Sequence, residues 1–104
     1  MTYQLTALYH HPEDVEAFGR HYDGTHVPLV TKLPGLRSYS VSRPGPDADG
    51  KQPPYYLIAV LTWDSLEAFQ AAVSSGEGQA TLADLSNFAG AGVEMCTGPS
   101  NAVV

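Results

Sequence analysis

The segment from Tyr55 to Trp63, YYLIAVLTW, is almost continuously apolar, and it constrains the fold more than any other stretch of the chain. Its length and its β-branched and aromatic residues predict a strand, and its lack of polar alternation predicts that both faces are buried. A chain of 104 residues has room for one domain. The strand therefore belongs in the middle of a sheet that is covered on both sides.

Other segments show the periodicities of strands and of amphipathic helices. Alternation with a period of two predicts strands, and apolar residues spaced three and four apart predict helices. The predicted strands lie at 2–9, 36–43 and 93–97, and the predicted helices at 12–33, 64–73 and 79–88. A loop rich in proline and glycine is expected at 44–54, and a loosely held tail at 98–104.

Local signals predict where the helices begin and bend. Pro12 suits the entry of the first helix, because the missing N–H of a proline costs nothing there. Pro28 is expected to kink or break this helix, to open a short second helical piece, and to push Val27 out of α geometry. Asp64 is expected to cap the second helix, with Glu67 completing a capping box.

The order β-α-β-β-α-(α)-β predicts an α+β fold of ferredoxin-like type, in which helices cover one face of a four-stranded antiparallel sheet. The other face would carry Ile58 and Val60, or alternatively Leu57 and Leu61, and both sets are apolar. Exposed apolar surface of that extent is rare in monomers. A homodimer formed through the sheet face is therefore expected.

Charge and composition exclude several kinds of partner. The formal net charge is −6, with only five Lys and Arg residues, so neither nucleic acid nor an anionic membrane surface is expected to bind. No apolar run approaches the ~20 residues of a membrane span, and the first residues lack the features of a secretory signal. The single cysteine, Cys96, cannot form an intrachain disulfide. These features predict a cytoplasmic protein.

Two segments resemble a known family. YDGTHVPLVTKLPGLRSYSV (22–41) and LTWDSLEAFQAAVSSGEGQATLADLSNFAG (61–90) are similar to the EthD family, and the resemblance extends over roughly residues 3 to 96. It implies a dimeric α+β barrel, in which two ferredoxin-like subunits join their sheets and each keeps a cleft between helices and sheet. Proteins of this superfamily include cofactor-free isomerases of muconolactones, polyketide cyclases and cofactor-free monooxygenases.

Three residues are candidates for catalysis. His26 lies in the apolar stripe of the first helix, and its imidazole can act as general base and acid near neutral pH. Tyr39 projects from the second strand and can donate a hydrogen bond to a ligand carbonyl or enolate. Asp84 matches the family pattern and can orient His26 or act as a second acid–base group. Each of the three also has a purely structural interpretation: His26 as a histidine packed in the broken helix, Tyr39 as a half-buried tyrosine of a strand, and Asp84 as an aspartate on a helix surface.

Further residues are expected to bind substrate in the same cleft. They lie one turn from His26, on the second and third strands, or in the run around Asp84: Tyr22, Leu29, Val41, Trp63, Asn87 and Phe88. Core roles are the alternatives for Trp63 and Phe88.

No metal or cofactor is expected. The adjacent His10 and His11 would point to opposite sides of a strand end, and His21 would lie about 140° around an α-helix from His26. No carboxylate–histidine spacing matches a metal motif, and no GxGxxG, P-loop or serine nucleophile elbow occurs.

The sequence thus predicts that the protein binds a small apolar carbonyl compound, lactone or aromatic molecule, with cofactor-free proton transfer as in an isomerase or cyclase. Two alternatives stay open. One is a cofactor-free monooxygenase, in which the substrate supplies the electrons. The other is a non-catalytic accessory protein of a degradation or biosynthetic pathway.

Overall fold

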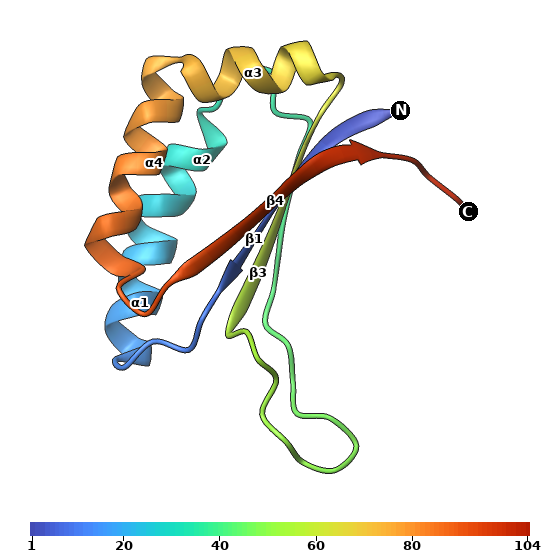
Figure 1. The fold of residues 1–104 in the computed structure, drawn as a ribbon. Helices are drawn as coiled ribbons and strands as arrows, with labels where there is room; N and C mark the ends of the chain where they lie inside the picture. The colour runs from blue at the N-terminus through green and yellow to red at the C-terminus, as the bar shows by residue number, and fades with distance from the viewer.

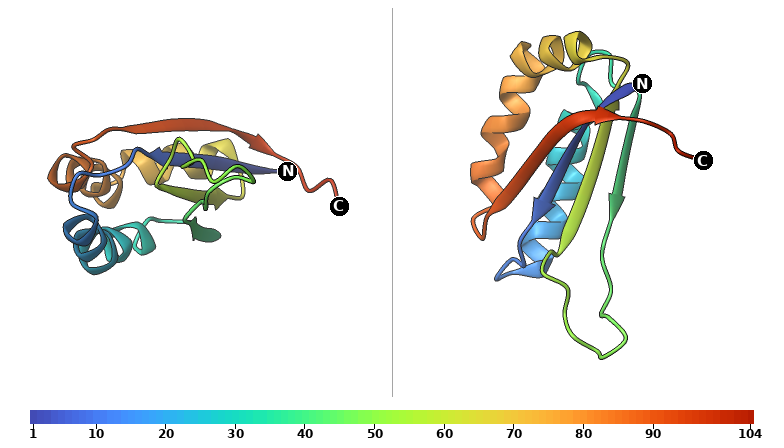
Figure 2. Two further views of the ribbon diagram at one scale, coloured as in Figure 1. Left: turned by 90° about the horizontal axis from the view of Figure 1, so that it is seen from below. Right: turned by 45° about the vertical axis from the view of Figure 1, so that its right-hand side comes forward.

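A computed structural model describes all 104 residues as one layer of helices against one four-stranded antiparallel sheet (Figures 1 and 2). The strands are β1 (Thr2–Tyr9), β2 (Ser38–Ser42), β3 (Leu57–Trp63) and β4 (Val93–Ser100). The helical segments are α1 (Val15–His21), the π-turn η1 (Tyr22–His26), α2 (Val27–Thr31), α3 (Leu66–Ser74) and α4 (Gly76–Phe88). The strand order β2-β3-β1-β4 confirms the predicted ferredoxin-like α+β fold.

The sheet buries alternate residues of β3 beneath the helices. Leu57, Ala59, Leu61 and Trp63 are all buried, whereas Ile58 and the other residues of the opposite face are only half-buried. No helix lies over this second face (Figure 2). Within one chain, the prediction that β3 is buried on both faces therefore holds for the helix side alone.

The first helix begins later than the sequence pattern predicted. Asp14 is its N-cap, and the Asp14 side chain accepts a hydrogen bond of 3.0 Å from the backbone N–H of Ala17. Pro12 lies before the helix, so the prediction that it opens the helix is wrong. Val15 is three residues before the buried Phe18, a spacing that predicts the apolar face, and yet it is 51% exposed at the first residue of the helix.

The helix stays continuous through Pro28 because a π-turn precedes the proline. The backbone N–H of Val27 bonds to the carbonyl of Tyr22, five residues back. Val27 keeps α geometry, with φ −57° and ψ −47°, so the predicted displacement of Val27 is wrong. As predicted, Pro28 lies in the first turn of a short second helical segment, α2, where no N–H is needed. The widened turn takes up the distortion that a proline introduces.

Helices α3 and α4 meet at one serine, Ser75. Ser65, rather than the predicted Asp64, caps α3 by accepting from the N–H of Ala68, while Asp64 forms an ion pair with Arg37 at 2.8 Å. Ser75 ends α3 and also caps α4, which begins at Gly76 rather than at residue 79.

The last strand is longer than predicted. Residues Gly98 to Ser100 pair with β1, and Ser100 lies opposite Thr2. Pro99 is tolerated because β4 is an edge strand. The loose tail predicted from Gly98 onward is therefore confined to residues 101–104. None of the helices combines the length and apolar character that crossing a bilayer would require.

Candidate functional site

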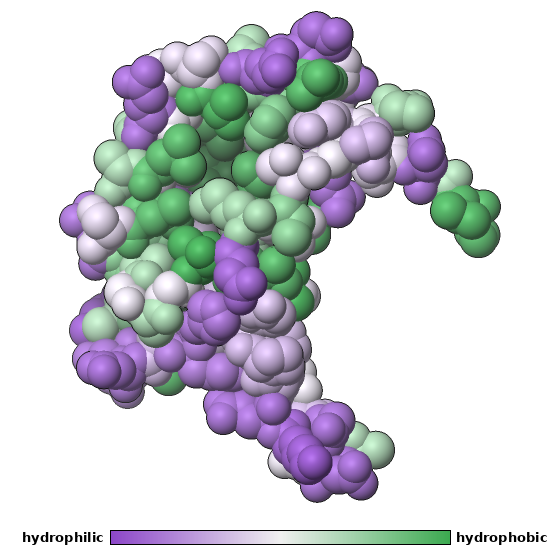
Figure 3. Space-filling model, in the orientation of Figure 1, coloured by the Kyte–Doolittle hydropathy of each residue, from purple (hydrophilic) through white to green (hydrophobic).

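A largely apolar cavity lies between the helices and the inner face of the sheet. It is open to solvent on one side, and 14 of its 17 lining residues are hydrophobic. Figure 3 shows hydrophobic residues gathered in the hollow between α3, α4 and the sheet. The lining residues are Leu5, Ala7, Tyr9, Tyr22, His26, Val30, Leu33, Tyr39, Ala59, Leu61, Trp63, Val73, Gly78, Thr81, Leu82, Leu85 and Met95.

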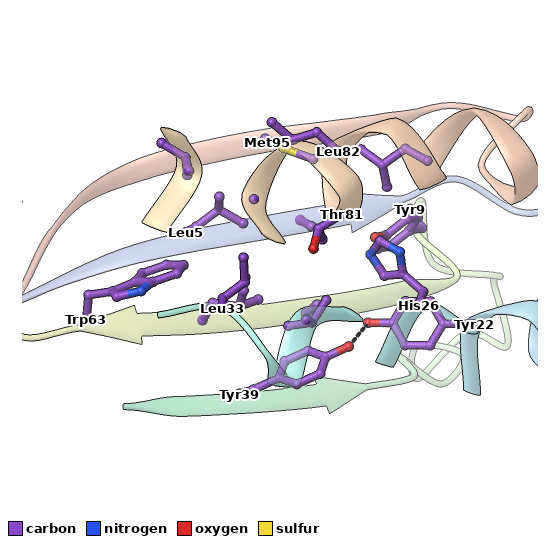
Figure 4. A pocket seen from close by; sticks show the side chains of 17 residues that line it. Leu5, Tyr9, Tyr22, His26, Leu33, Tyr39, Trp63, Thr81, Leu82 and Met95 are labelled. Atoms are coloured by element: carbon purple, nitrogen blue, oxygen red, sulfur yellow. Dashed lines mark hydrogen bonds between the residues drawn. The ribbon is translucent and has the colours of Figure 1, made fainter. Parts of the chain in front are cut away.

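The polar groups gather at one end of this cavity. His26, Tyr22 and Tyr39 lie together there, while Trp63 lies at the other end (Figure 4). Leu82 and Met95 line the cavity and yet are 48% and 40% exposed, so they mark its mouth between α4 and β4. A ligand would therefore place its apolar part in most of the cavity and its polar atoms near His26.

His26 is held by a buried carboxylate on α4. Its Nδ1 lies 3.0 Å from Oδ2 of Asp84, and the side chains of His26 and Asp84 are only 4% and 6% exposed. A carboxylate accepts hydrogen bonds, so Nδ1 of His26 carries the proton and donates. In neutral His26 the lone pair therefore lies on Nε2. That atom makes no bond within the protein and is not fully enclosed by it.

Burial lowers the pKa of His26 below the ordinary value of 6.5, and the hydrogen bond and charge of Asp84 offset only part of this effect. The charge of His21 lowers the pKa further. His26 is therefore neutral at pH 7, with Nε2 free to accept a proton. This is the state that a general base requires.

Asp84 is the centre of the polar cluster. Burial alone would raise its pKa, but hydrogen bonds from Asn87, His21 and His26 lower the pKa below 3.8. Asn87 Nδ2 donates to Oδ1 at 3.0 Å, and His21 Nε2 lies 2.8 Å from the same oxygen. The carboxylate is thus ionised and has three side-chain donors.

The π-turn brings His21 to Asp84. Hydrogen bonds of the i→i+5 type place residues five apart about one turn from each other, so His21 and His26 point to the same carboxylate. The predicted separation of about 140° assumed an α-helix and is wrong. His21 stacks on Phe88, with ring centroids 5.1 Å apart.

A surface groove between α1 and α4 exposes part of His21. The His21 side chain is 27% exposed, and it lines this groove rather than the cavity. The groove is lined by Pro12, Glu13, Asp14, Ala17, Phe18, His21, Asn87, Phe88, Gly90 and Ala91. Asp84 therefore lies between a histidine that reaches the cavity and a histidine that reaches the surface.

A pair of tyrosines lies beside His26 at the polar end of the cavity, and the rings of Tyr22 and His26 have centroids 5.4 Å apart. The hydroxyl groups of Tyr22 and Tyr39 are hydrogen-bonded at 2.6 Å. Either hydroxyl can be the donor in this bond. Tyr22 is 1% exposed, and when its O–H donates to Tyr39, the O–H of Tyr39 is left to donate to a ligand. Burial raises the pKa of both tyrosines, so both are protonated at neutral pH.

The structure separates the predicted substrate-binding residues into two groups. Tyr22 and Trp63 line the cavity, and the indole N–H of Trp63 donates to the carbonyl of Pro34. Leu29 and Val41 do not line it, and Val30 and Leu33 occupy the helix side instead. Val30 is one full turn after His26, which aligns it with the histidine more closely than Leu29.

Asn87 and Phe88 lie behind Asp84, on the side of the groove. Both contact the histidine–aspartate cluster, because Asn87 donates to Asp84 and the ring centroids of Phe88 and His26 lie 4.8 Å apart.

Three residues of the site, His21, Tyr9 and Thr81, were not predicted as site residues from the sequence. A proline two residues after His26 is the one signal in the sequence that pointed to an irregular turn.

The remaining histidines have other partners. His10 Nε2 lies 2.9 Å from Oε2 of Glu94, and His11 Nε2 lies 2.6 Å from the carbonyl of Pro53. No group of three or more His, Cys, Asp or Glu side chains is arranged to hold a metal ion.

More distant structures share the fold. A dimeric ferredoxin-like protein from Thermobifida fusca has a TM-score of 0.68 at 17% identity, over 93% of this chain and 89% of its own. SnoaB, a cofactor-independent oxygenase from Streptomyces nogalater, has a TM-score of 0.66 at 14% identity, over 99% of this chain and 95% of its own. These likenesses concern the fold alone.

Closer relatives extend over almost the whole chain. An 11.0 kDa protein encoded in the thcB–thcC intergenic region of Rhodococcus erythropolis is 39% identical, over 89% of each chain. The crystal structure of an ethyl tert-butyl ether degradation (EthD) family protein from Bacillus halodurans has a TM-score of 0.90 at 38% identity, covering 97% of this chain and all of that one. The model of the EthD domain matches residues 10–92. With the domain match, the sequence identity and the shared fold in agreement, this chain belongs to the EthD family.

Proposed function

We propose that this protein binds a small, mostly apolar molecule with a carbonyl or lactone oxygen and catalyses a proton transfer on it. The observation that carries the proposal is the bond between Asp84 and Nδ1 of His26 at the polar end of an apolar cavity. It leaves the lone pair of His26 Nε2 available to a ligand.

His26 would act as the base and then as the acid. Nε2 would take a proton from carbon next to the carbonyl group, and the same imidazolium would return it to another atom of the ligand. Asp84 would stabilise the imidazolium through the Nδ1–H bond, as the carboxylate of a catalytic triad does. Because His26 and Asp84 are both buried, water competes little for this interaction.

Tyr39 would stabilise the oxygen on which negative charge develops. Its O–H would be free to donate when Tyr22 donates to its oxygen, and that bond would strengthen Tyr39 as a donor. Such a donor accelerates the reaction only if its bond is stronger in the transition state than in the ground state. Asn87, which was expected to bind substrate, donates to Asp84 outside the cavity and is not available for this task.

A homodimer is part of the proposal. The sheet face opposite the helices carries Leu8, Ile58 and Val60, with Leu8 paired to Ile58. A second copy of the chain would cover this apolar face, as the dimeric state of ferredoxin-like proteins supports. We place this dimer in the cytoplasm, in a degradation or biosynthetic pathway.

The test is a comparison of wild type with His26→Gln, using lactones and hydroxylated aromatic compounds as probes. Ligand binding is followed by NMR, and proton exchange from carbon by loss of deuterium label. We expect His26→Gln to bind the same probe and to exchange roughly 10²–10⁴-fold more slowly. Binding without exchange in wild type would favour an accessory binding protein, and oxygen consumption with a hydroxylated aromatic would favour an oxygenase.

A further inference from the structure

We propose that His21 is a positioning residue that keeps His26 available as a base, because His21 takes up the first proton that the His21–Asp84–His26 cluster binds. The inference rests on the proposed role of His26, and it concerns how that role persists in mildly acidic solution.

Both histidines depend on one carboxylate. His21 Nε2 lies 2.8 Å from Oδ1 and 3.0 Å from Oδ2 of Asp84, and His26 Nδ1 lies 3.0 Å from Oδ2. A single negative charge stabilises one positive charge next to it, and a second positive charge is repelled by the first. The two imidazoles therefore compete for Asp84, and the cluster titrates as a coupled unit.

The surroundings of the two rings decide which one is charged first. The His21 side chain is 27% exposed and its Nδ1 is not enclosed, so water can solvate an imidazolium there. The His26 side chain is 4% exposed, and an imidazolium in the apolar cavity would lose most of its hydration. Solvation thus favours a positive charge on His21.

Neighbouring charges act in the same direction. Glu13 and Asp14 line the groove that exposes His21, and the groove has no Lys or Arg among its lining residues. Arg20, the neighbour of His21, has its own acidic partner in Glu16 at 4.0 Å. No charged side chain lines the cavity, where the titratable neighbours of His26 are Tyr9, Tyr22 and Tyr39, and the carboxylate of Asp84 lies behind His26.

A proton on His21 would protect His26 in two ways. The imidazolium would lie against Asp84 and would neutralise the charge that otherwise stabilises protonated His26. It would also repel a second proton directly, in agreement with the lowering of the pKa of His26 by the charge of His21. Nε2 of His26 would consequently keep its lone pair at pH values where an isolated Asp–His pair is protonated.

The experiment is an NMR titration of the imidazole signals in the full-length protein, compared with His21→Gln. In wild type we expect His21 to become protonated at a higher pH than His26. In His21→Gln, whose amide can still donate to Asp84, we expect the pKa of His26 to rise. If the proposed reaction is observed, the acidic limb of its pH–rate profile should move to higher pH by the same amount.

Other outcomes would overturn the proposal. Protonation of His26 before His21 in wild type would do so, and this measurement needs no variant. An unchanged or lower pKa of His26 in a folded His21→Gln protein would also do so, because a merely structural role of His21 predicts loss of support for Asp84. The titration requires no turnover, so it can succeed even if His26→Gln shows that the proposed reaction does not occur. His10→Gln is the control, because His10 pairs with Glu94 and should leave His26 unaffected.

Discussion

The hydroxyl oxygens of Tyr22 and Tyr39 lie 2.6 Å apart, although one residue belongs to the π-turn and the other to the strand β2 at the edge of the sheet. This hydrogen bond joins the helix layer to the sheet at the polar end of the cavity. In the proposed mechanism the buried Tyr22 would support Tyr39, and Tyr39 would contact the ligand.

Phenylalanine variants of Tyr22 and Tyr39 should distinguish the effect of the hydroxyl pair on ligand affinity from its effect on the free energy of unfolding. We expect Tyr39→Phe to weaken binding of a carbonyl probe about tenfold, and to lower the free energy of unfolding by about 1–3 kcal/mol because the buried Tyr22 O–H loses its acceptor. The double variant Tyr22→Phe/Tyr39→Phe should regain much of that stability without regaining affinity. Calorimetric titration and denaturant unfolding measure the two effects. Losses of stability that simply add in the double variant would show that the hydroxyls do not act as a pair.

Asp84→Asn should disrupt the whole cluster. The amide has one acceptor oxygen in place of two, so a buried donor loses its partner, and we expect the free energy of unfolding to fall by about 1–3 kcal/mol. The pKa of His26 should also fall, because the carboxylate that stabilises its imidazolium is gone. Asp64→Asn is a matched control, since its exposed pair with Arg37 is worth at most about 1 kcal/mol. Equal stability of the two variants would contradict the central role of Asp84.

Stability should decline in two steps as the pH falls. The pKa of His26 is lowered by folding, so below its unfolded value of 6.5 the unfolded chain binds a proton that the folded chain still refuses. The free energy of unfolding should therefore decrease from about pH 6.5 down to the lowered pKa of His26. The pKa of Asp84 is also lowered, and a second decrease should begin near pH 3.8. Urea unfolding at a series of pH values measures both steps, and a His26→Gln protein that retains the first step unchanged would refute its assignment.

Two glycines should respond in opposite directions to replacement by alanine. A Cβ at Gly78 would collide with the backbone carbonyl oxygen of Ala72 at the corner between α3 and α4. Because a backbone atom cannot move aside as a flexible side chain can, we expect Gly78→Ala to lower the free energy of unfolding by about 1–3 kcal/mol. A Cβ at Gly19 in α1 meets nothing within 4 Å, and Gly19→Ala should stabilise the protein by about 0.5–1 kcal/mol. Thermal unfolding compares the two, and equal effects would argue against the tight corner.

The sequence was sufficient to predict the fold because the signals were strong and repeated. The alternation of Tyr3 to Tyr9, the apolar run ending at Trp63 and the spaced apolar residues of the helices each have one simple interpretation. Individual caps were less predictable. Asp64 and Ser65 are both good N-cap residues. In the structure Asp64 pairs with Arg37, a residue distant in sequence, and Ser65 caps the helix.

The candidate site was predictable only in part, for a reason of geometry. His26, Asp84 and Tyr39 were each singled out from their types and positions, and the structure places all three at the polar end of the cavity or directly behind it. His21 was considered only as a partner of His26 at a metal site, and an α-helix was assumed to point the two rings apart. A single i→i+5 turn instead brings both histidines to the carboxylate of Asp84.

The pairing of Thr2 with Ser100 has a consequence for how the chain can be cut and rejoined. The two ends lie side by side on adjacent strands, and only a few unpaired residues follow Ser100. The long hairpin loop of residues 44–54 projects from the far side of the sheet, away from α3 and α4 (Figure 1). A short linker between the present ends, with new ends opened in that loop, would give a circular permutant in which β1 and β4 become one continuous hairpin and every residue of the cavity keeps its neighbours.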